Sequence, residues 1–302
     1  MRKMTFLSSF IIKIAAIVFM TLDHVGLLLS MLYPADMTIV GTYGLATIFR
    51  TFGRLALPLF AFMIVEGVIH TKSIKKYFLR LGILAALISI VFIVAEYSSL
   101  SSATGSLLRA GNIFLDLLLL ALAVYLLKQP KLPLKFLTLL IVGFSVLSFV
   151  VKCTEQSTGF DLYWYPAFLT MQYDWFTIVL GIAFYFSYYV ADTYIKLQEN
   201  RSGLDKDMWI ENGNYRLLVN ISSIFFLVVI SIFYYLFTFF WPSGVFWDAS
   251  SQVYAIFSGA FILLYNGKRG YNAKWFQYGS YLYYPLHILV IGIIYIIAIG
   301  GI

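Results

Sequence analysis

Cysteine, histidine and charge are all scarce in this 302-residue chain. The single cysteine, Cys153, excludes an internal disulfide framework and a CxxC metal site, and we expect no metal. Only 12% of the residues are charged and 61% are hydrophobic, whereas a soluble domain is nearer a quarter charged and half apolar. A chain of this composition cannot hide its apolar surface from water. We therefore expect an all-α, polytopic transmembrane helix bundle.

Long apolar runs occupy most of the chain. A helix needs roughly 20 apolar residues to cross about 30 Å of hydrocarbon. The run after the first residues is too long for a cleavable signal peptide and lacks a small-residue cleavage site, so we expect it to remain as the first helix. The eighth run is short for a full crossing and either extends backwards or is tilted. The runs predict about nine spans in one transmembrane domain, 1–302, at 7–33, 53–71, 76–97, 106–127, 134–152, 174–194, 217–241, 251–265 and 280–300.

The segments between these runs alternate in charge. The neutral or acidic ones carry Asp36, Glu155, Asp161 and Asp248. Cytoplasmic loops carry the excess of Lys and Arg, so we predict a cytoplasmic amino terminus and an extracytoplasmic carboxyl terminus in a plasma or inner membrane. The net charge of +7 then reflects orientation in the lipid bilayer, and no nucleic-acid partner is expected. The basic segments carry Arg2 and Lys3; Lys72, Lys75, Lys76 and Arg80; Lys128, Lys131 and Lys135; Lys196, Arg201, Lys206 and Arg216; and Lys268, Arg269 and Lys274.

Two connecting segments are longer than simple turns. Residues 195–216 are polar and predict a cytoplasmic loop, with Gly203 and Gly213 as helix breakers. Residues 153–173 are rich in aromatic side chains and contain Pro166. Because Trp and Tyr favour the membrane interface, this second segment is either an outer lid or a re-entrant hairpin.

An ionisable residue inside a span is costly, so it suggests function. If the hydrocarbon part of the first span begins near Lys13, Asp23 and His24, in TLDHVG, lie about ten residues or ~15 Å along it, near the midplane. Neighbouring residues point about 100° apart on a helix, so each needs a partner on another helix. His24 is the natural general base, since imidazole titrates near working pH. The alternative is a purely structural interhelical hydrogen bond.

The second span carries three more candidates, Arg54, Glu66 and His70. Arg54 lies at its outer end, whereas Glu66 and His70 are four residues apart and share a face near the cytoplasmic end. Glu66 must pair with a cation or face water. We take Glu66 as a catalytic candidate and Arg54 and His70 as substrate-binding candidates, although His70 also suits an interfacial position. Asn112, at the start of the fourth span, is either a further substrate contact or only a helix cap.

Two motifs mark the end of the chain. In NGKRG, at 266–270, the glycines allow close backbone approach and the cations, with Lys274, suit a phosphate; a positive-inside turn is the alternative. In YGSYLYYPLH, Pro285 loosens the last helix beside Tyr284 and His287. Freed backbone groups are tolerated in a span only where protein or a wet cavity satisfies them, so this motif indicates a cavity.

Taken in order, LDHVG, GRLALPLFAFMIVEG followed by His-Thr and a basic stretch, GNIF, NGKRG and YYPLH resemble the TraX family in sequence and spacing. The resemblance covers most of the chain. The family is named for the conjugative-transfer protein that acetylates the amino terminus of pilin. Its architecture is similar to that of other membrane-bound acyltransferases that use acetyl-CoA. The resemblance therefore implies a transmembrane N- or O-acetyltransferase with acetyl-CoA as co-substrate.

The resemblance also implies roles for the candidates. His24 becomes the general base, and Asp23 orients either a cation such as Arg54 or the base itself, with Glu66 as a substitute. The acceptor is a protein or glycan at the membrane or outer face: a pilin-like amino terminus, a glycan hydroxyl and a lipid-linked sugar all stay open. The phosphates of the cytoplasmic coenzyme are expected on the basic residues, and its thin arm on the last helix: Lys268, Arg269, Lys274, Lys75, Lys76, Arg80, Tyr284 and His287.

Two other classes of protein compete with this interpretation. A proton-coupled secondary transporter explains buried Asp, His and Glu residues equally well. It does not explain the basic turn before a tyrosine-rich last helix, and no internal repeat is evident. A scaffold of a secretion system, without an active site, is the remaining alternative.

Overall fold

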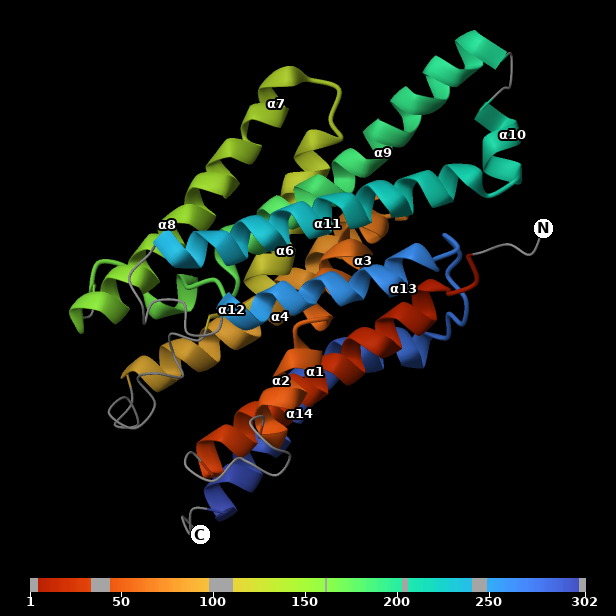
Figure 1. Cartoon of the computed structure of the whole chain (residues 1–302). Coiled ribbons are helices and arrows are strands. Elements are labelled where there is room, and N and C mark those ends of the chain that lie inside the picture. The colour runs from red at the N-terminus through yellow and green to blue at the C-terminus, as the bar shows by residue number, and fades with distance from the viewer. Residues whose placement is uncertain are drawn as a thin grey trace. The chain divides into compact units, whose positions relative to one another are not determined.

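The structure, a computed structural model, describes residues 5–33, 44–97, 111–160, 162–202, 206–240 and 249–298. These residues are almost entirely helical, which confirms the all-α prediction; Leu7 and Tyr265 form the only β-bridge among them. The helices are α1 (Ser9–Leu32), α2 (Leu45–Gly53), α3 (Ala56–His70), α4 (Ile74–Tyr97), α6 (Ile113–Leu127), α7 (Leu132–Phe136), α8 (Thr138–Thr158), η1 (Ala167–Leu169), α9 (Asp174–Ser202), α10 (Lys206–Glu211), α11 (Asn214–Phe240), α12 (Ala249–Gln252), η2 (Val253–Ser258), α13 (Gly259–Leu263) and α14 (Lys274–Ala298) (Figure 1).

Six helical segments among the described residues are long and apolar enough to cross a membrane: Ser9–Leu32, Leu45–His70, Leu132–Thr158, Ala167–Asn200, Asn214–Phe237 and Lys274–Ala298. The other three predicted spans coincide with α4, α6 and the run from α12 to α13. Capacity to span a membrane is therefore a property of the fold, whereas the count of nine and the orientation stay predictions. Outside the described residues lie 106–110, 241 and 299–300 of the predicted spans, together with Arg2, Lys3, Asp36, Asp161, Gly203 and Asp248.

The predicted cytoplasmic loop at 195–216 is largely helical instead. Helix α9 continues to Ser202, and α10 covers Lys206–Glu211. The sequence KLQEN that follows the apolar run consists mostly of good helix formers, so the helix continues beyond the apolar run. The Nζ atom of Lys206 lies 2.6 Å from a carboxylate oxygen of Asp192, which ties α10 to α9. Gly213 breaks the helix as predicted, with a φ of 74°.

The chain divides into two compact units. Unit 1 comprises Met1–Phe60, Ser187–Tyr235 and Asp248–Ile302, and unit 2 comprises Ala61–Phe186 and Leu236–Trp247. Unit 1 therefore holds α1, α2 and α12 to α14, whereas unit 2 holds α4 and α6 to α8. The division falls within α3, α9 and α11.

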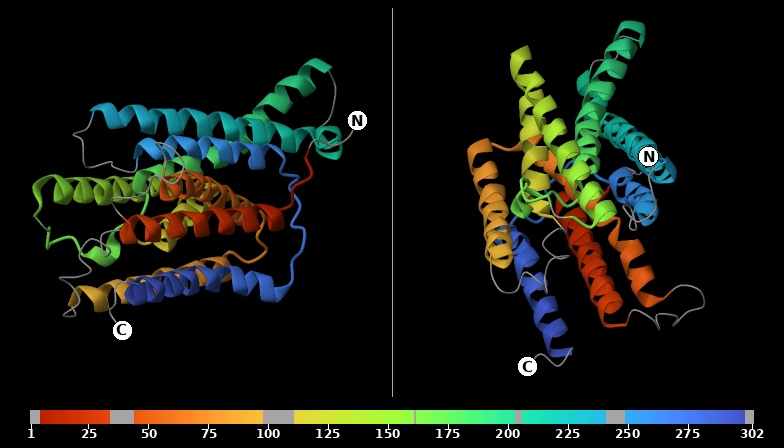
Figure 2. Two further views of the ribbon diagram at one scale, coloured as in Figure 1. Left: turned by 60° about the horizontal axis from the view of Figure 1, so that its bottom comes forward. Right: turned by 90° about the vertical axis from the view of Figure 1, so that its left-hand side faces the viewer.

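Helices α1 and α2 pack closely in unit 1 because two glycines remove side chains from their interface. A Cβ atom on Gly26 would meet the Ala46 carbonyl and the Arg50 side chain, and one on Gly53 would collide with Asp23. Small residues serve this purpose in membrane helices, where close backbone approach replaces the hydrophobic drive of water. Helix α14 runs alongside α1 (Figure 2), and His287 is its one buried residue among those described.

Segments predicted to share a membrane face lie together within each unit. In unit 1, the Lys268 carbonyl accepts from the Ser9 N–H at 2.8 Å, which joins two basic segments. In unit 2, Lys128 Nζ donates to the Ile69 carbonyl at 3.0 Å, joining two more. At the opposite ends of unit 2, the Asn112 N–H donates to Thr170 O at 2.9 Å. Each contact joins ends of segments that the charge pattern assigns to one face of the membrane.

Candidate functional site

A pair of histidines joins α1 to α14 in unit 1. His24 Nδ1 lies 2.9 Å from His287 Nε2, and the two residues are only 9% and 8% exposed. His287 Nδ1 is 2.8 Å from the Tyr283 carbonyl, one turn earlier in α14. His24 thus has the partner on another helix that its place in the first span predicts. That partner is His287, a residue that was expected at the coenzyme and not at the base.

Asp23, the neighbour of His24, points to a different partner. Its Oδ1 atom lies 2.5 Å from an Arg54 guanidinium nitrogen, and the Asp23 and Arg54 residues are 9% and 4% exposed. Of the two partners predicted for Asp23, the cation is therefore the one that the structure supports. Gly53 makes the pair possible because any side chain there would occupy the place of the Asp23 carboxylate.

Aromatic and cationic side chains surround the histidine pair. The Tyr283 ring stacks on His287 with centroids 5.0 Å apart, and Tyr284 is edge-on to both imidazoles, at 5.9 Å from His24 and 5.3 Å from His287. Thr21 Oγ1 donates to the Ile17 carbonyl, so the Tyr283 hydroxyl, 2.8 Å away, donates to Thr21. The charges of Arg50 and Arg54 also act on His24. Unit 1 thus holds a buried imidazole beside two guanidinium groups.

The NGKRG turn in unit 1 is held firmly by its backbone. Gly267 and Gly270 adopt φ values of 74° and 70°, and Gly270 packs against Ser8. The carbonyls of Lys268 and Arg269 accept from the first N–H groups of α1, which caps that helix. Both glycines therefore serve the turn itself. The side chains of Lys268, Arg269 and Lys274 are exposed and free to meet a solvent-borne anion.

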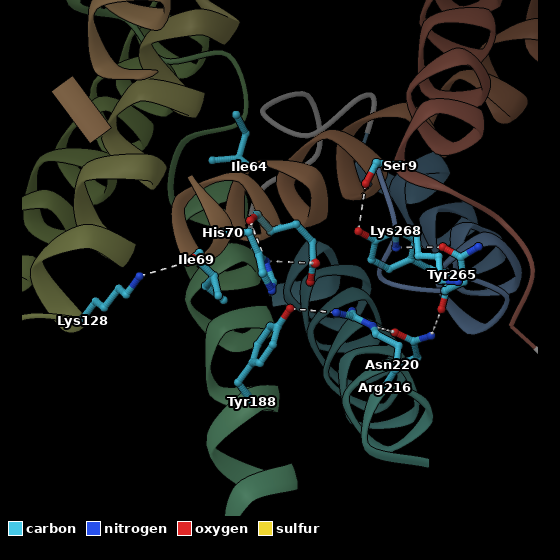
Figure 3. A network of polar contacts seen from close by, with 12 residues as sticks. Ser9, Ile64, Ile69, His70, Lys128, Tyr188, Arg216, Asn220, Tyr265 and Lys268 are labelled. Atoms are coloured by element: carbon cyan, nitrogen blue, oxygen red, sulfur yellow. Dashed lines mark hydrogen bonds and ion pairs between the residues drawn. The ribbon is translucent and has the colours of Figure 1, made fainter. Parts of the chain in front are cut away.

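A buried polar network supports this turn from within unit 1 (Figure 3). Asn220, which is fully buried, donates to the Tyr265 carbonyl at 2.8 Å and accepts from Arg216 Nε at 2.8 Å. Arg216 also donates to the Tyr188 hydroxyl at 2.8 Å and lies over the Tyr265 ring at 4.6 Å. The Tyr265 hydroxyl is 2.9 Å from Ser9 Oγ. The network fixes the residue just before NGKRG to α1, α9 and α11.

The remaining candidates lie in unit 2. Glu66 is buried, and His70 Nδ1 is 3.0 Å from the Glu66 carbonyl and 3.7 Å from the Glu66 carboxylate, as the four-residue spacing predicted. Asn112 is the N-cap of α6: its Oδ1 accepts from the N–H groups of the first turn, and its amide donates to Ala85 O and Ser89 Oγ. The cap interpretation of Asn112 therefore accounts for its whole side chain. Lys75, Lys76 and Arg80 lie on the first turns of α4.

The sequence profile described as "TraX protein" matches residues 8–197, well over half of the chain. The chain belongs to the TraX family. The match includes His24, Arg54, Glu66 and Asn112 and ends before NGKRG and His287.

One curated relative, described as "Probable fimbrial assembly protein FimC, serogroup H1" from Dichelobacter nodosus, is 31% identical to this TraX chain over 144 residues. The match covers 46% of the chain and 55% of the relative, so the chain spans about half the length of this relative. No solved structure matches the chain.

Sequence reasoning missed a second buried cluster, in unit 2 of this TraX protein. The Asp116 carboxylate, fully buried, accepts from the N–H groups of Gln172 and Tyr173 at 2.7 and 2.9 Å. Lys152 pairs with Asp174 and donates to the carbonyls of Met171 and Gln172 at 2.9 and 3.1 Å. The signal was present, because Asp116 is an acidic residue within the apolar run IFLDLLLL.

This cluster also settles how the aromatic segment 153–173 is built. Helix α8 ends at Gly159, whose φ is 71°, and the next residues carry exposed rings, with Tyr163 92% exposed. Thr170 and Met171 are fully buried, and their backbone groups bond to side chains or backbone of α6 and α8. Irregular backbone in a membrane protein is tolerated where protein satisfies it. Residues 153–158 therefore complete α8, Tyr163 and Trp164 are exposed, and residues 165–173 are held by side chains of the neighbouring helices.

Proposed function

We propose that this protein is a membrane-embedded acyltransferase that moves an acetyl group from cytoplasmic acetyl-CoA to an amine or hydroxyl at the membrane. The observation that carries the proposal is the buried His24–His287 pair on two helices that can span the membrane. An ionisable pair at such a position is costly and calls for a functional reason. Membership of the TraX family supports acyl transfer as that reason.

His24 is the general base of the proposed reaction. As the acceptor nitrogen or oxygen attacks the thioester carbonyl, its proton moves to the His24 imidazole. The C–S bond then breaks with its electron pair on sulfur, and the thiolate takes that proton from the imidazolium. Arg50 and Arg54 supply positive charge close to His24, which suits the oxyanion that forms when the carbonyl is attacked. Asp23 holds Arg54 in place.

The coenzyme phosphates bind at the exposed cations Lys268, Arg269 and Lys274 in the proposed enzyme. Lys13 lies close enough to Arg269 for their charges to interact, so positive charge is concentrated at this end of unit 1. Tyr284 is ten residues beyond Lys274 in α14, or about 15 Å at 1.5 Å per residue. This distance is comparable to the length of an extended pantetheine arm. Lys75, Lys76 and Arg80, on the first turns of α4 in unit 2, are separate candidates for binding phosphate.

The preferred acceptor is a pilin-like amino terminus. The curated relative carries the name of a fimbrial assembly protein, which supports an acceptor of this kind. An α-amino group must lose a proton on acylation, so this acceptor requires the base that His24 provides. A surface glycan hydroxyl has the same requirement.

The proposal is tested by incubating wild-type and His24→Ala protein in liposomes with radiolabelled acetyl-CoA and a peptide bearing the amino-terminal segment of pilin. We expect label on the wild-type product and none above background with His24→Ala. Melting temperature and helical content of both proteins establish that the variant is folded. Full transfer by a folded His24→Ala protein would eliminate the proposed base.

Coenzyme A binding separates an acyltransferase from a transporter. A ligand at one hundred times its dissociation constant stabilises the folded state by about 2.7 kcal/mol. We therefore expect coenzyme A to raise the melting temperature, and ADP, which lacks the pantetheine arm, to raise it less. Absence of any shift with coenzyme A would favour the transporter.

A further inference from the structure

His287 stands apart from the rest of α14. The helix exposes most of its large apolar side chains, including Leu286 at 54% and Leu289 at 59%, whereas His287 is 8% exposed. The imidazole lies between the Tyr283 ring and the His24 ring. Its two nitrogens have two different partners, the Tyr283 carbonyl and His24 Nδ1.

These two partners determine where the protons are. A carbonyl oxygen only accepts, so His287 Nδ1 carries a hydrogen and donates it to Tyr283 O. In the neutral imidazole the other nitrogen, Nε2, then has a lone pair. His24 Nδ1, 2.9 Å away, must therefore be the donor.

From this we infer that His287 is a positioning residue that fixes the tautomer of His24, so that His24 Nε2 is the basic atom. Among the residues that the structure describes, no hydrogen bond to His24 Nε2 is made. A ring nitrogen with a lone pair and no internal partner is what a general base requires. The inference rests on the proposed acyltransferase function.

His287 also acts when the proton has been taken up. An acceptor proton that moves to His24 Nε2 makes the ring an imidazolium, and its Nδ1–H bond to His287 becomes charge-assisted. Such hydrogen bonds are roughly twice as strong as neutral ones. The bond therefore stabilises the charged intermediate more than the resting state, in the way that an acidic partner does in acid–histidine pairs. This is a contribution to kcat and not to coenzyme binding.

The test compares three substitutions of His287 that differ in reach. The amide of His287→Gln stands near the former Nε2 and can accept from His24. The amide of His287→Asn stands near the former Nδ1, so its side chain is too short to accept a hydrogen bond from His24. The side chain of His287→Leu has no acceptor atom for this hydrogen bond. Leu286→Ala, on the exposed side of the same turn, is the control for general damage to α14.

We expect His287→Leu and His287→Asn to lose kcat on the order of 10- to 100-fold, the effect of removing the second partner of a functional imidazole. The KM for acetyl-CoA should change little. His287→Gln should retain most of the wild-type kcat, as should Leu286→Ala. If His287→Leu does not fold, the ratio of kcat between His287→Gln and His287→Asn is sufficient to test the inference.

Wild-type kcat in His287→Leu or His287→Asn, or equal losses in Gln and Asn, would overturn the inference. Failure of the proposed function is distinct, because it shows as a wild-type protein that neither transfers acetyl groups nor is stabilised by coenzyme A.

Discussion

The two units each bury a polar cluster, and the clusters differ in what their polar groups contact. In unit 2, the charges of Asp116, Lys152 and Asp174 meet each other or the backbone of residues 171–173. In unit 1, Asp23 holds Arg54 in an ion pair, while the neighbouring His24 uses Nδ1 and keeps Nε2 without a bond among the described residues.

Buried charge therefore has two uses in this protein. The unit 2 cluster holds irregular backbone together, so its loss should reduce stability. The unit 1 cluster keeps one basic atom available, so its loss should reduce activity. Burial alone does not separate these uses, because Asp116 is as inaccessible as any residue in the chain. The kind of partner does separate them: the unit 2 charges hold the backbone of residues 171–173, whereas His24 meets a second imidazole.

Lys152→Met should have the largest effect on stability. It leaves Asp174 without its cation and two carbonyls without their donor. Breaking a buried ion pair on one side costs about 3–5 kcal/mol. We expect a loss of this size in the free energy of unfolding in detergent, with turnover per folded molecule unchanged. Lys131→Met, at an exposed lysine, is the control, and equal melting temperatures for the two variants would contradict the structural role.

Asp23→Leu should follow, since it leaves the Arg54 guanidinium without its carboxylate. A hydrogen bond to a charged group contributes about 1.5–3 kcal/mol. The double variant Asp23→Leu/Arg54→Met should recover much of that stability, because two apolar partners replace a buried pair at little cost. Acetyl transfer should not recover. A double variant with wild-type transfer would show that the pair has no role beyond stability.

Gly53→Ala should have a smaller effect through the same pair. The added methyl collides with the Asp23 carboxylate, and overpacking of this kind costs about 1–3 kcal/mol. Gly143, within α8, is the matched control because a Cβ atom there meets nothing. Gly143→Ala should stabilise slightly, since Ala is the better helix former. Thermal unfolding of both variants measures the difference in stability between them. Equal stability of Gly53→Ala and Gly143→Ala would contradict the close contact between Gly53 and Asp23.

Arg269→Ala should have the smallest effect, on coenzyme binding alone. The side chain is exposed, and an exposed ion pair contributes about 1 kcal/mol at most, or roughly fivefold in affinity. We expect the KM for acetyl-CoA to rise by no more than this, with kcat unchanged. The effect should shrink at 1 M salt, where the Debye length is about 3 Å. A change in kcat would place Arg269 in the chemistry instead.

The sequence alone was sufficient for the helices but not for their partners. Apolar runs located α1, α4, α8 and α14 because hydrophobicity is a local property. The Asp23–Arg54 pair was among the predicted options, and the spacing of Glu66 and His70 was sufficient to place them together. The boundary of α9 was wrong because a polar sequence can continue a helix beyond the membrane.

The histidine pair was not predictable in the same way. His24 and His287 are separated by 263 residues, and nothing local distinguishes a coenzyme contact from a partner of the base. The packing of residues 165–173 could not be predicted from the sequence either, because it depends on side chains of three other helices, α4, α6 and α8. Asp116, by contrast, could have been identified from the sequence, because an ionisable residue within an apolar run needs an explanation. The same reasoning applies to Arg50, which lies four residues before Arg54.

The most direct measurement compares single-turnover acetyl transfer, per folded molecule, in His24→Gln and Asp116→Asn, one isosteric amide in each unit. We expect His24→Gln to keep the wild-type melting temperature and to lose transfer by on the order of 10²–10⁴. Asp116→Asn should melt at a lower temperature and transfer at the wild-type rate. Near wild-type transfer by a folded His24→Gln protein would contradict the assignment of His24 as the base.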